Sequence, residues 1–377
     1  LQFDTAGAFV RSFGAGLFVF PHSIHVDREG NVWAADAALP ESTPGKGHTV
    51  VKFDREGKVL LTLGKPGVAG DGSDTFNRPS GVATAPNGDV YVSDGHGGKS
   101  NARVMKFSKD GKFIRSWGKK GKGRGEFDEL HAIALDSQGR VFVGDRGNGL
   151  IKIFDGDGNL IDEWKQFGRP SGIYIDKADN IYVTDSQSDA KRNPGFRRGI
   201  RVGSAKDGSV RALIPGVGPE PDKESVPEGV AADAQGNLYV ADTGNHAIRR
   251  IGIDGQVTTL AVGEQGHADG PVAQARFDAP MGIAVDAQGQ VTDEEGEDDH
   301  SVAYAQQTQL RWDQPLPAGW RMTLGAQWPL DRLSDLSTSD GETDLATLRR
   351  PTQALFAQAH WRPDDAWQLE AGWRQEH

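Results

Sequence analysis

One motif recurs six times along the 377-residue chain, and this repeat constrains the fold more than any other feature. Each copy has a run of alternating apolar residues, then a turn of Asp, Asn and Gly, then a β-branched or aromatic run that usually closes on Asp. Because Gly and Asn tolerate the positive φ angles of tight turns, each copy predicts a β-hairpin. The copies begin at Pro21, Arg78, Leu130, Arg169, Val226 and Ala279.

Most copies are followed by a second pair of short strands, as in VMKFSKDGKFIRSWG and IKIFDGDGNLIDEW. Four antiparallel strands that repeat every roughly 40 to 60 residues are typical of propeller blades and not of a helical solenoid. We therefore predict an all-β fold, with a six-bladed β-propeller over residues 1–291. Residues 1–14 have the pattern of two outer strands and residues 279–291 that of two inner strands, so the two ends would close the ring in one shared blade.

Composition excludes several classes of function. The net charge of −11 argues against a nucleic-acid partner, because neutralising phosphates needs a basic surface. The absence of cysteine excludes disulfides and thiolate chemistry. No apolar run reaches the length of a membrane-spanning helix.

The innermost strand of each blade lines the central channel, so the residue at its start faces the axis. Two imidazoles and one carboxylate stand at this position in the first, third and fifth blades, about 120° apart. Such a set with an open fourth position is a recognised catalytic zinc site. The sequence thus predicts a metal site formed by His22, His131 and Glu228; the alternative is that these side chains only bond to water and backbone. The six positions are His22, Ser80, His131, Ser171, Glu228 and Met281.

Residues 1–250 resemble the propeller of the peptidyl-α-hydroxyglycine α-amidating lyases, which belong with the NHL-repeat propellers, and residues up to 291 resemble generic NHL repeats. The segments that carry the resemblance are FPHSIHVDREGNVWAAD, RPSGVATAPNGDVYVSDGHG, ARVMKFSKDGKFIRSWG and LHAIALDSQGRVFVGDRGNGLIKIF. The family holds zinc with three His at the openings of alternate blades, so the resemblance implies Zn or another divalent transition metal. His22 and His131 match two of these ligands and Glu228 stands at the third.

The resemblance also implies catalytic residues. His96 follows Asp94-Gly95 where the family has a tyrosine, and it would act as the base. Arg146 of GDRGN matches a family arginine and would bind a substrate carboxylate. Another family arginine has no counterpart here, and the calcium-binding carboxylate of the family is replaced by Gly229, although calcium stays an alternative cofactor. The implied substrate is a small molecule or peptide C-terminus, cleaved at an α-hydroxyglycine to a peptide amide and glyoxylate.

Two other functional classes remain open. A non-enzymatic NHL propeller would present its channel face to a protein or other ligand, and YVADTGNHAIRRIGIDGQ is closer to generic NHL repeats than to the lyase. His246 and His267 are then loop and turn residues. A calcium-dependent lactonase of similar shape would need Asp, Asn and Glu around the channel in place of two His.

The pattern changes after Val291. Residues 292–300, TDEEGEDDH, predict an acidic linker. Residues 301–377 alternate apolar and polar residues with aromatics at the strand ends, as in WRMTLGAQW, and resemble barrel strands of TonB-dependent receptors. They provide roughly four strands where the smallest barrels need about eight, so this segment is not expected to close alone, and a chimeric chain is a further interpretation. The two resemblances imply a periplasmic or secreted, envelope-associated protein, with membrane association through the C-terminal segment.

Overall fold

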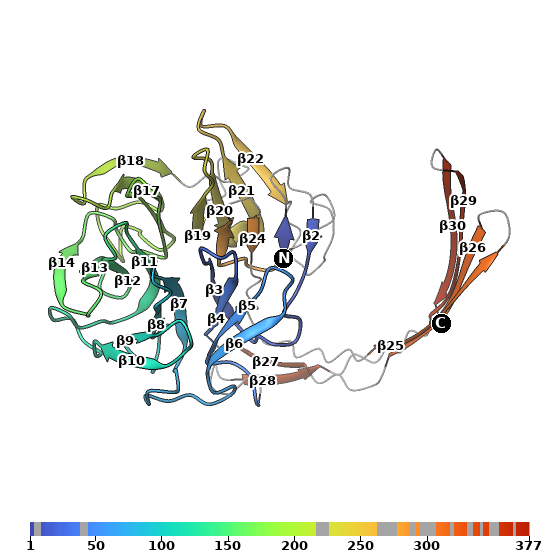
Figure 1. Ribbon diagram of the computed structural model, residues 1–377, viewed down its shortest axis with the longest axis horizontal. Helices are drawn as coiled ribbons and strands as arrows, with labels where there is room; N and C mark the ends of the chain where they lie inside the picture. The colour runs from blue at the N-terminus through green and yellow to red at the C-terminus, as the bar shows by residue number, and fades with distance from the viewer. Residues whose placement is uncertain are drawn as a thin grey trace. The chain divides into compact units, whose positions relative to one another are not determined.

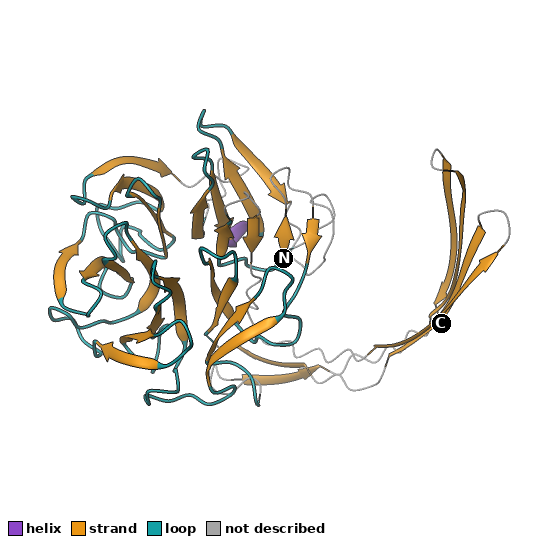
Figure 2. Ribbon diagram, in the orientation of Figure 1, coloured by secondary structure: helices purple, strands orange, loops and turns teal. Residues whose placement is uncertain are grey.

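The computed structural model describes residues 1–3, 9–37, 44–215, 226–261, 277–286 and 291–293, together with the strands β25 to β30 between residues 307 and 376. Contacts divide the chain into two units, Leu1–Asp298 and Asp299–His377. The described elements are strands apart from one 3-10 turn, Thr243–Asn245 (Figure 2). Among these residues no helix has the length and apolar character to cross a membrane.

The first unit is a six-bladed β-propeller, which confirms the prediction from the repeat (Figure 1). Five blades each contain four strands that are consecutive in the chain and antiparallel. The strands are β3 (Pro21–Val26), β4 (Val32–Asp36), β5 (Thr49–Phe53) and β6 (Val59–Gly64); β7 (Pro79–Thr84), β8 (Val90–Asp94), β9 (Arg103–Phe107) and β10 (Phe113–Trp117); β11 (Leu130–Leu135), β12 (Val141–Asp145), β13 (Leu150–Phe154) and β14 (Leu160–Trp164); β15 (Gly172–Ile175), β16 (Asn180–Asp185), β17 (Gly199–Ser204) and β18 (Val210–Pro215); and β19 (Pro227–Ala232), β20 (Leu238–Asp242), β21 (Ala247–Ile251) and β22 (Val257–Ala261).

The sixth blade combines strands from the two ends of this unit. Its order is β2-β1-β24-β23, where β1 is Gln2–Phe3, β2 is Phe9–Arg11, β23 is Ile283–Val285 and β24 is Val291–Asp293. Phe3 pairs with Val291, and Gln2 pairs with Thr292. The strand β24 thus includes two residues that the sequence assigned to the acidic linker, while residues 294–300 lie outside the described part of the chain. This pairing completes the four strands of the sixth blade and closes the ring.

Apolar packing between neighbouring blades holds the ring together. The second strand of most blades is buried along its whole length, whereas most residues of the fourth strands, such as β10, are exposed. Tyr91 and Val104 of the second blade pack in one cluster with Ile133 and Val141 of the third. Burying each such side chain contributes about 1.5 to 3 kcal/mol. Among the described residues, the buried apolar side chains form six separate clusters within the ring.

The inner strands of all six blades line the channel, from His22 and Glu228 at one level to His25 and Tyr174 at another. This arrangement brings the opening residues of distant repeats around one axis. Sequence separation of more than 200 residues between His22 and Glu228 is therefore no obstacle to their meeting.

The second unit contains a sheet of order β25-β26-β29-β30 and a separate hairpin, β27-β28. The strands are β25 (Gln307–Leu316), β26 (Trp320–Pro329), β27 (Asp335–Ser339), β28 (Glu342–Ala346), β29 (Ala354–Asp364) and β30 (Trp367–Glu376). The four strands of the larger sheet have 10 or 11 residues each. The resemblance of this segment to receptor barrel strands stays a prediction.

Replacing Phe3 by Ala tests the shared sixth blade. Phe3 is 5% exposed and packs with Phe277, Ile283 and Val291. We expect Phe3→Ala to lower the free energy of unfolding by about 3 to 5 kcal/mol, as measured by guanidinium unfolding followed by tryptophan fluorescence. Val59→Ala, at a residue 42% exposed on an outer strand, is the control and should cost under about 0.5 kcal/mol. Equal losses in the two variants would contradict the closure by β1.

Candidate functional site

In four blades the inner strand begins with a β-bulge, and the candidate site residues of the inner strands lie at these bulges. The strand register shifts between Pro21 and Ser23, and likewise between Leu130 and Ala132. A bulge turns the side chain of the extra residue out of the regular alternation, here toward the channel. The proline that begins several inner strands is tolerated because it is the first residue of an edge strand. The residues at the shifts are His22, Ser80, His131 and Glu228.

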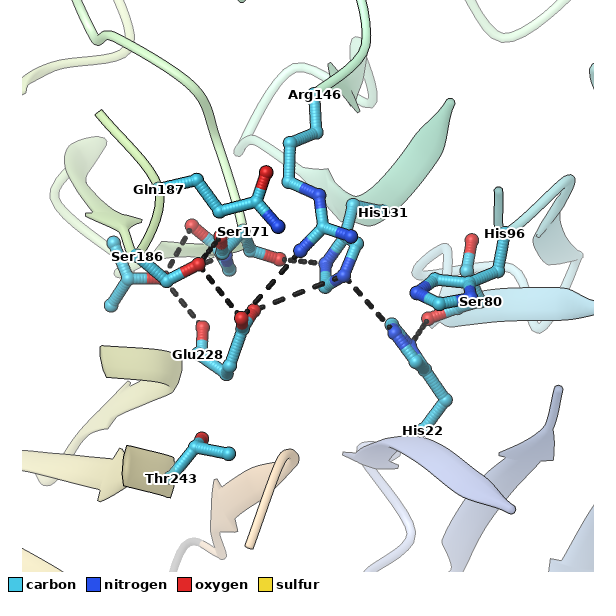
Figure 3. Close-up of polar contacts among 12 residues, drawn as sticks. His22, Ser80, His96, His131, Arg146, Ser171, Ser186, Gln187, Glu228 and Thr243 are labelled. Atoms are coloured by element: carbon cyan, nitrogen blue, oxygen red, sulfur yellow. Dashed lines mark hydrogen bonds and ion pairs between the residues drawn. The ribbon is translucent and has the colours of Figure 1, made fainter. Parts of the chain in front are cut away.

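His22 and His131 face each other across the channel, and the Nδ1 atom of each ring is hydrogen-bonded to a backbone carbonyl. The Nδ1 of His22 lies 2.8 Å from the carbonyl oxygen of Ser80, and the Nδ1 of His131 lies 2.7 Å from that of Ser171. A carbonyl only accepts, so both Nδ1 atoms carry a hydrogen. Each neutral ring then has a lone pair on Nε2, and these two atoms are 3.2 Å apart (Figure 3).

The electrostatic environment keeps these rings uncharged. Burial lowers the pKa of His22 to about 3, with the carbonyl of Ser80 opposing the effect. Burial also holds the pKa of His131 well below its ordinary value, and the charge of Arg146 adds to this. Two neutral Nε2 lone pairs cannot hydrogen-bond to each other, and a proton or a cation between them would make the contact favourable.

Glu228 completes this side of the channel. Its Oε1 accepts a hydrogen bond from the hydroxyl of Ser186 at 2.7 Å and lies 3.5 Å from Nη1 of Arg146. Its Oε2 lies 3.8 Å from Nε2 of His131, is buried and has no hydrogen-bond partner among the described residues. Burial raises the pKa of Glu228, and the charge of Arg146 opposes that rise. A bound cation would compensate a buried carboxylate oxygen that has no hydrogen-bond donor.

Two of the three distances between the predicted metal ligands suit a divalent transition metal. Tetrahedral zinc holds His and carboxylate donors at about 2.0 to 2.2 Å, which places donor atoms about 3.3 to 3.6 Å from one another. The Nε2 atoms of His22 and His131 are 3.2 Å apart, and the His131 to Glu228 distance is 3.8 Å. The set His22, His131 and Glu228 stays a prediction. Its donor types suit the metal, but Glu228 is not in the group of described residues whose ligand atoms all lie within 4.8 Å of one another, which is His22, His96 and His131.

His96 belongs to the same cluster. Its ring centroid lies 4.3 Å from that of His22 and 5.0 Å from that of His131, and Phe20 borders both His22 and His96. One ring nitrogen from each of the three histidines lies within 4.8 Å of the others, so three imidazoles form an alternative ligand set. The family resemblance implied a catalytic role for His96, which stays a prediction; the structure places this loop residue in contact with the two inner-strand histidines.

Arg78 determines the tautomer of His96. Its Nη2 lies 3.3 Å from Nδ1 of His96, and a guanidinium group only donates. The Nδ1 atom therefore accepts, and the hydrogen of the neutral ring is on Nε2. Burial, together with the positive charges of Arg146 and Arg78, holds the pKa of His96 well below its ordinary value. The predicted base is thus in its neutral form.

Arg146 bridges two carboxylates in this structure. Its Nη2 donates to Oε1 of Glu129 at 2.9 Å, and its Nη1 faces Oε1 of Glu228 at 3.5 Å. Although burial raises the pKa of Glu129, the hydrogen bond from Arg146 holds it below the ordinary value. The sequence analysis assigned Arg146 to a substrate carboxylate and missed Glu129, whose only signal is an acidic residue directly before an inner strand.

Two further histidines have structural contacts between blades. His246 accepts the backbone N–H of Ala279 at its Nδ1, at 3.1 Å, and His48 accepts that of Arg78 at 3.2 Å. Both histidines have positive φ angles, 49° and 58°. Each therefore ties its blade to the start of the next one. His267 lies outside the described residues.

Removing Arg146 tests its role between the two glutamates. In Arg146→Met both carboxylates lose the buried guanidinium group that compensates their charge. We therefore expect the free energy of unfolding to fall by about 3 to 5 kcal/mol, measured after a chelator has removed any metal. Arg146→Lys retains the charge and should lose less. Arg124→Met, at an exposed loop residue, is the control and should change stability by under about 0.5 kcal/mol. A loss no larger than that of the control would show that the bridge contributes nothing to the fold.

Comparison with known proteins agrees with the fold. A family model described as NHL repeat matches residues 225–251, and one described as 6-bladed beta-propeller matches residues 85–167. The first match covers β19 to β21 of the fifth blade, and the second covers β8 to β10 of the second blade and the whole of the third.

Several curated proteins are similar to the propeller. Peptidyl-glycine alpha-amidating monooxygenase B of Xenopus laevis is 30% identical over 257 residues, which are 63% of this chain and 27% of that protein. The probable peptidyl-alpha-hydroxyglycine alpha-amidating lyase pgal-1 of Caenorhabditis elegans is 30% identical over 181 residues, 46% of each chain. NHL repeat-containing protein 3 of Homo sapiens is 35% identical over 170 residues, 44% of this chain and 47% of that protein. The matched parts thus span under half of each relative, and the chain contains a six-bladed NHL-type β-propeller that is similar to that of the α-amidating lyases.

Proposed function

We propose that His22, His131 and Glu228 hold a divalent transition metal, zinc being the first candidate, and that the propeller cleaves peptidyl-α-hydroxyglycine to a peptide amide and glyoxylate. The observation that carries the proposal is the pair of Nε2 atoms 3.2 Å apart, each with its Nδ1 bonded to a carbonyl. The similarity to the amidating lyase of Caenorhabditis elegans supports the choice of reaction.

The residues of the site supply a proton acceptor beside the cation ligands. A divalent metal when bound would supply Lewis acidity, which makes a nearby hydroxyl group easier to deprotonate. His96 is neutral, so its Nδ1 can accept the proton of the carbinol hydroxyl once Arg78 releases that nitrogen. The electron pair on the oxygen then forms the carbonyl of glyoxylate as the carbon–nitrogen bond breaks. The amide nitrogen leaves with the bond pair and takes a proton back from His96.

The surroundings of the three rings favour such a transfer. Phe20 packs edge-on against His22 and also borders His96. His22 and His131 are 4% and 3% exposed. Little water reaches these nitrogens, so the charges of Arg78 and Arg146 act at low dielectric and disfavour a protonated resting state of His96.

Metal content tests the ligand set. We expect about one equivalent of transition metal in the parent protein by elemental analysis, and a loss of most of it in His22→Ala, His131→Ala and Glu228→Ala. His25→Gln is the matched control, since His25 lies on the same strand but bonds to Thr84 instead of the cluster.

The variant His96→Ala distinguishes between two metal-ligand sets, the proposed one with Glu228 and the alternative one of three imidazoles. Because His96 is proposed as the base, this variant should retain metal. If His96→Ala loses the metal and Glu228→Ala keeps it, three imidazoles are the ligands and the proposed set is wrong. A parent protein that binds no metal after reconstitution would remove the metal from the proposal altogether.

Glyoxylate release tests the reaction. With N-benzoyl-α-hydroxyglycine as substrate, we expect turnover by the metal-loaded parent and a fall of about 10² to 10⁴-fold in kcat for His96→Ala. Because the pKa of His96 is well below 6.5, its base form persists at mildly acidic pH, so the acid limb of the kcat profile should lie below pH 6.5. His25→Gln should keep parental turnover. No glyoxylate above background from metal-loaded parent between pH 5 and pH 9 would contradict the lyase.

A second candidate function is a binding scaffold. The NHL repeat match in the fifth blade and the similarity to NHL repeat-containing protein 3 favour it. It requires neither a metal nor turnover. A stable parent protein with an empty metal analysis and no glyoxylate release would make it the preferred function.

A further inference from the structure

We propose that Arg78 and Arg169 form a carboxylate-binding subsite at the mouth of the channel. The proposal rests on the proposed function for the identity of the ligand, which would be the carboxylate of the α-hydroxyglycine substrate. It moves the carboxylate-binding role from Arg146 to two arginines that the sequence analysis did not consider.

Arg146 is poorly placed to accept another anion. It is 6% exposed, and both of its terminal nitrogens face carboxylates, Glu129 at 2.9 Å and Glu228 at 3.5 Å. A substrate carboxylate bound there would add a third negative charge around one guanidinium group. The two glutamates would then lose part of their compensation in a buried environment.

Arg78 has donors without an anionic acceptor. No carboxylate of the described residues lies within ion-pair distance of it, and its Nε is buried without a hydrogen-bond partner. Its one side-chain partner is the neutral ring of His96, at 3.3 Å. A methyl group on Gly98 would lie 3.3 Å from Nη1 of Arg78, so the loop glycine leaves room beside this nitrogen.

Arg169 repeats the arrangement two blades further on. It occupies the same position of the motif, since both blades open with RPSG. Its Nη2 donates to the side-chain oxygen of Gln187 at 3.1 Å, and its Nε is also buried without a partner. Gln187 directly follows Ser186, whose hydroxyl donates to Oε1 of Glu228 at 2.7 Å (Figure 3). Among the described residues, this neutral amide is the only side-chain acceptor of Arg169, just as a neutral imidazole is that of Arg78.

Both arginines interact electrostatically with the carboxylate of Glu129. The charge of Glu129 opposes the lowering of the Arg78 pKa by burial, and the charge of Arg169 contributes to the low pKa of Glu129. Arg78, Arg146 and Arg169 thus face two glutamates, which leaves one guanidinium charge in excess even without a metal. Guanidinium groups bind carboxylates through two parallel N–H donors, a stronger contact than one to a neutral amide or imidazole.

The subsite would couple substrate binding to the base. In this structure Arg78 donates to Nδ1 of His96. A carboxylate is a better acceptor than imidazole, so a bound substrate draws this donor away and frees the lone pair on Nδ1. The proton acceptor would therefore become available only when a substrate with a carboxylate is present.

Binding of two matched ligands tests the subsite without turnover. N-benzoylglycine carries the carboxylate, N-benzoylglycinamide lacks it, and neither has the hydroxyl group that is cleaved. By calorimetry we expect the parent to prefer the acid by about 10- to 100-fold, and less at high salt. Arg78→Gln and Arg169→Gln should each reduce the preference, and the double variant should abolish it. Arg124→Gln removes an exposed arginine and should behave as the parent.

Repeating the titrations after a chelator has removed any metal tests whether the metal causes the preference. The preference for the acid over the amide, and its dependence on both arginines, should remain. Circular dichroism and unfolding curves that match those of Arg124→Gln establish that the variants are folded. An unchanged preference in the folded double variant, or no preference in the parent, overturns the subsite. If the preference depends on the arginines while the parent releases no glyoxylate, the subsite stands and the proposed reaction fails.

Discussion

Buried aspartates at the ends of the second strands fix the geometry on which the site depends. Asp36 accepts the backbone N–H groups of Val19 and Phe20 at 3.0 and 2.8 Å, directly before the strand that carries His22. Asp145 does the same for Asp128 and Glu129, directly before His131. A buried carboxylate is stable only when its oxygens are satisfied, so the incoming segment cannot shift without a large penalty. These hydrogen bonds, two residues before His22 and His131, thereby fix the position of each channel-facing residue.

The repeat explains why so much of the fold could be predicted from sequence. Each hairpin has local signals, and a four-stranded unit that repeats six times leaves little choice but a ring. His22 and His131 could be found because the start of an inner strand faces the axis in every blade. Their approach to 3.2 Å depends on carbonyls supplied by neighbouring blades, those of Ser80 and Ser171. No local pattern encodes that contact.

The residues that sequence reasoning missed lie where the chain leaves regular structure. Arg78 has a φ angle of 68°, and its conformation is held by the ring of His48 from the preceding blade. Glu129 and Gln187 stand on loops whose direction follows from the packing of several blades. Such positions have no periodicity, so their convergence on one mouth becomes apparent only in three dimensions. The same reason explains why Arg146 could be assigned to a ligand while its two internal partners were overlooked.

Glu228 connects the ligand set to the arginines. A glutamate in place of a third imidazole adds a negative charge, which would weaken the Lewis acidity of a bound metal. Arg146, at 3.5 Å, and the Ser186 hydroxyl, at 2.7 Å, share Oε1 of this glutamate and leave Oε2 turned toward His131. Partners of this kind orient a ligand and draw charge from it, as residues behind metal ligands commonly do. In the proposed ligand set, the exchange of imidazole for carboxylate would thus be partly compensated within the chain, but only while Arg146 stays with the two glutamates. This is the physical reason to look for the substrate carboxylate at Arg78 and Arg169.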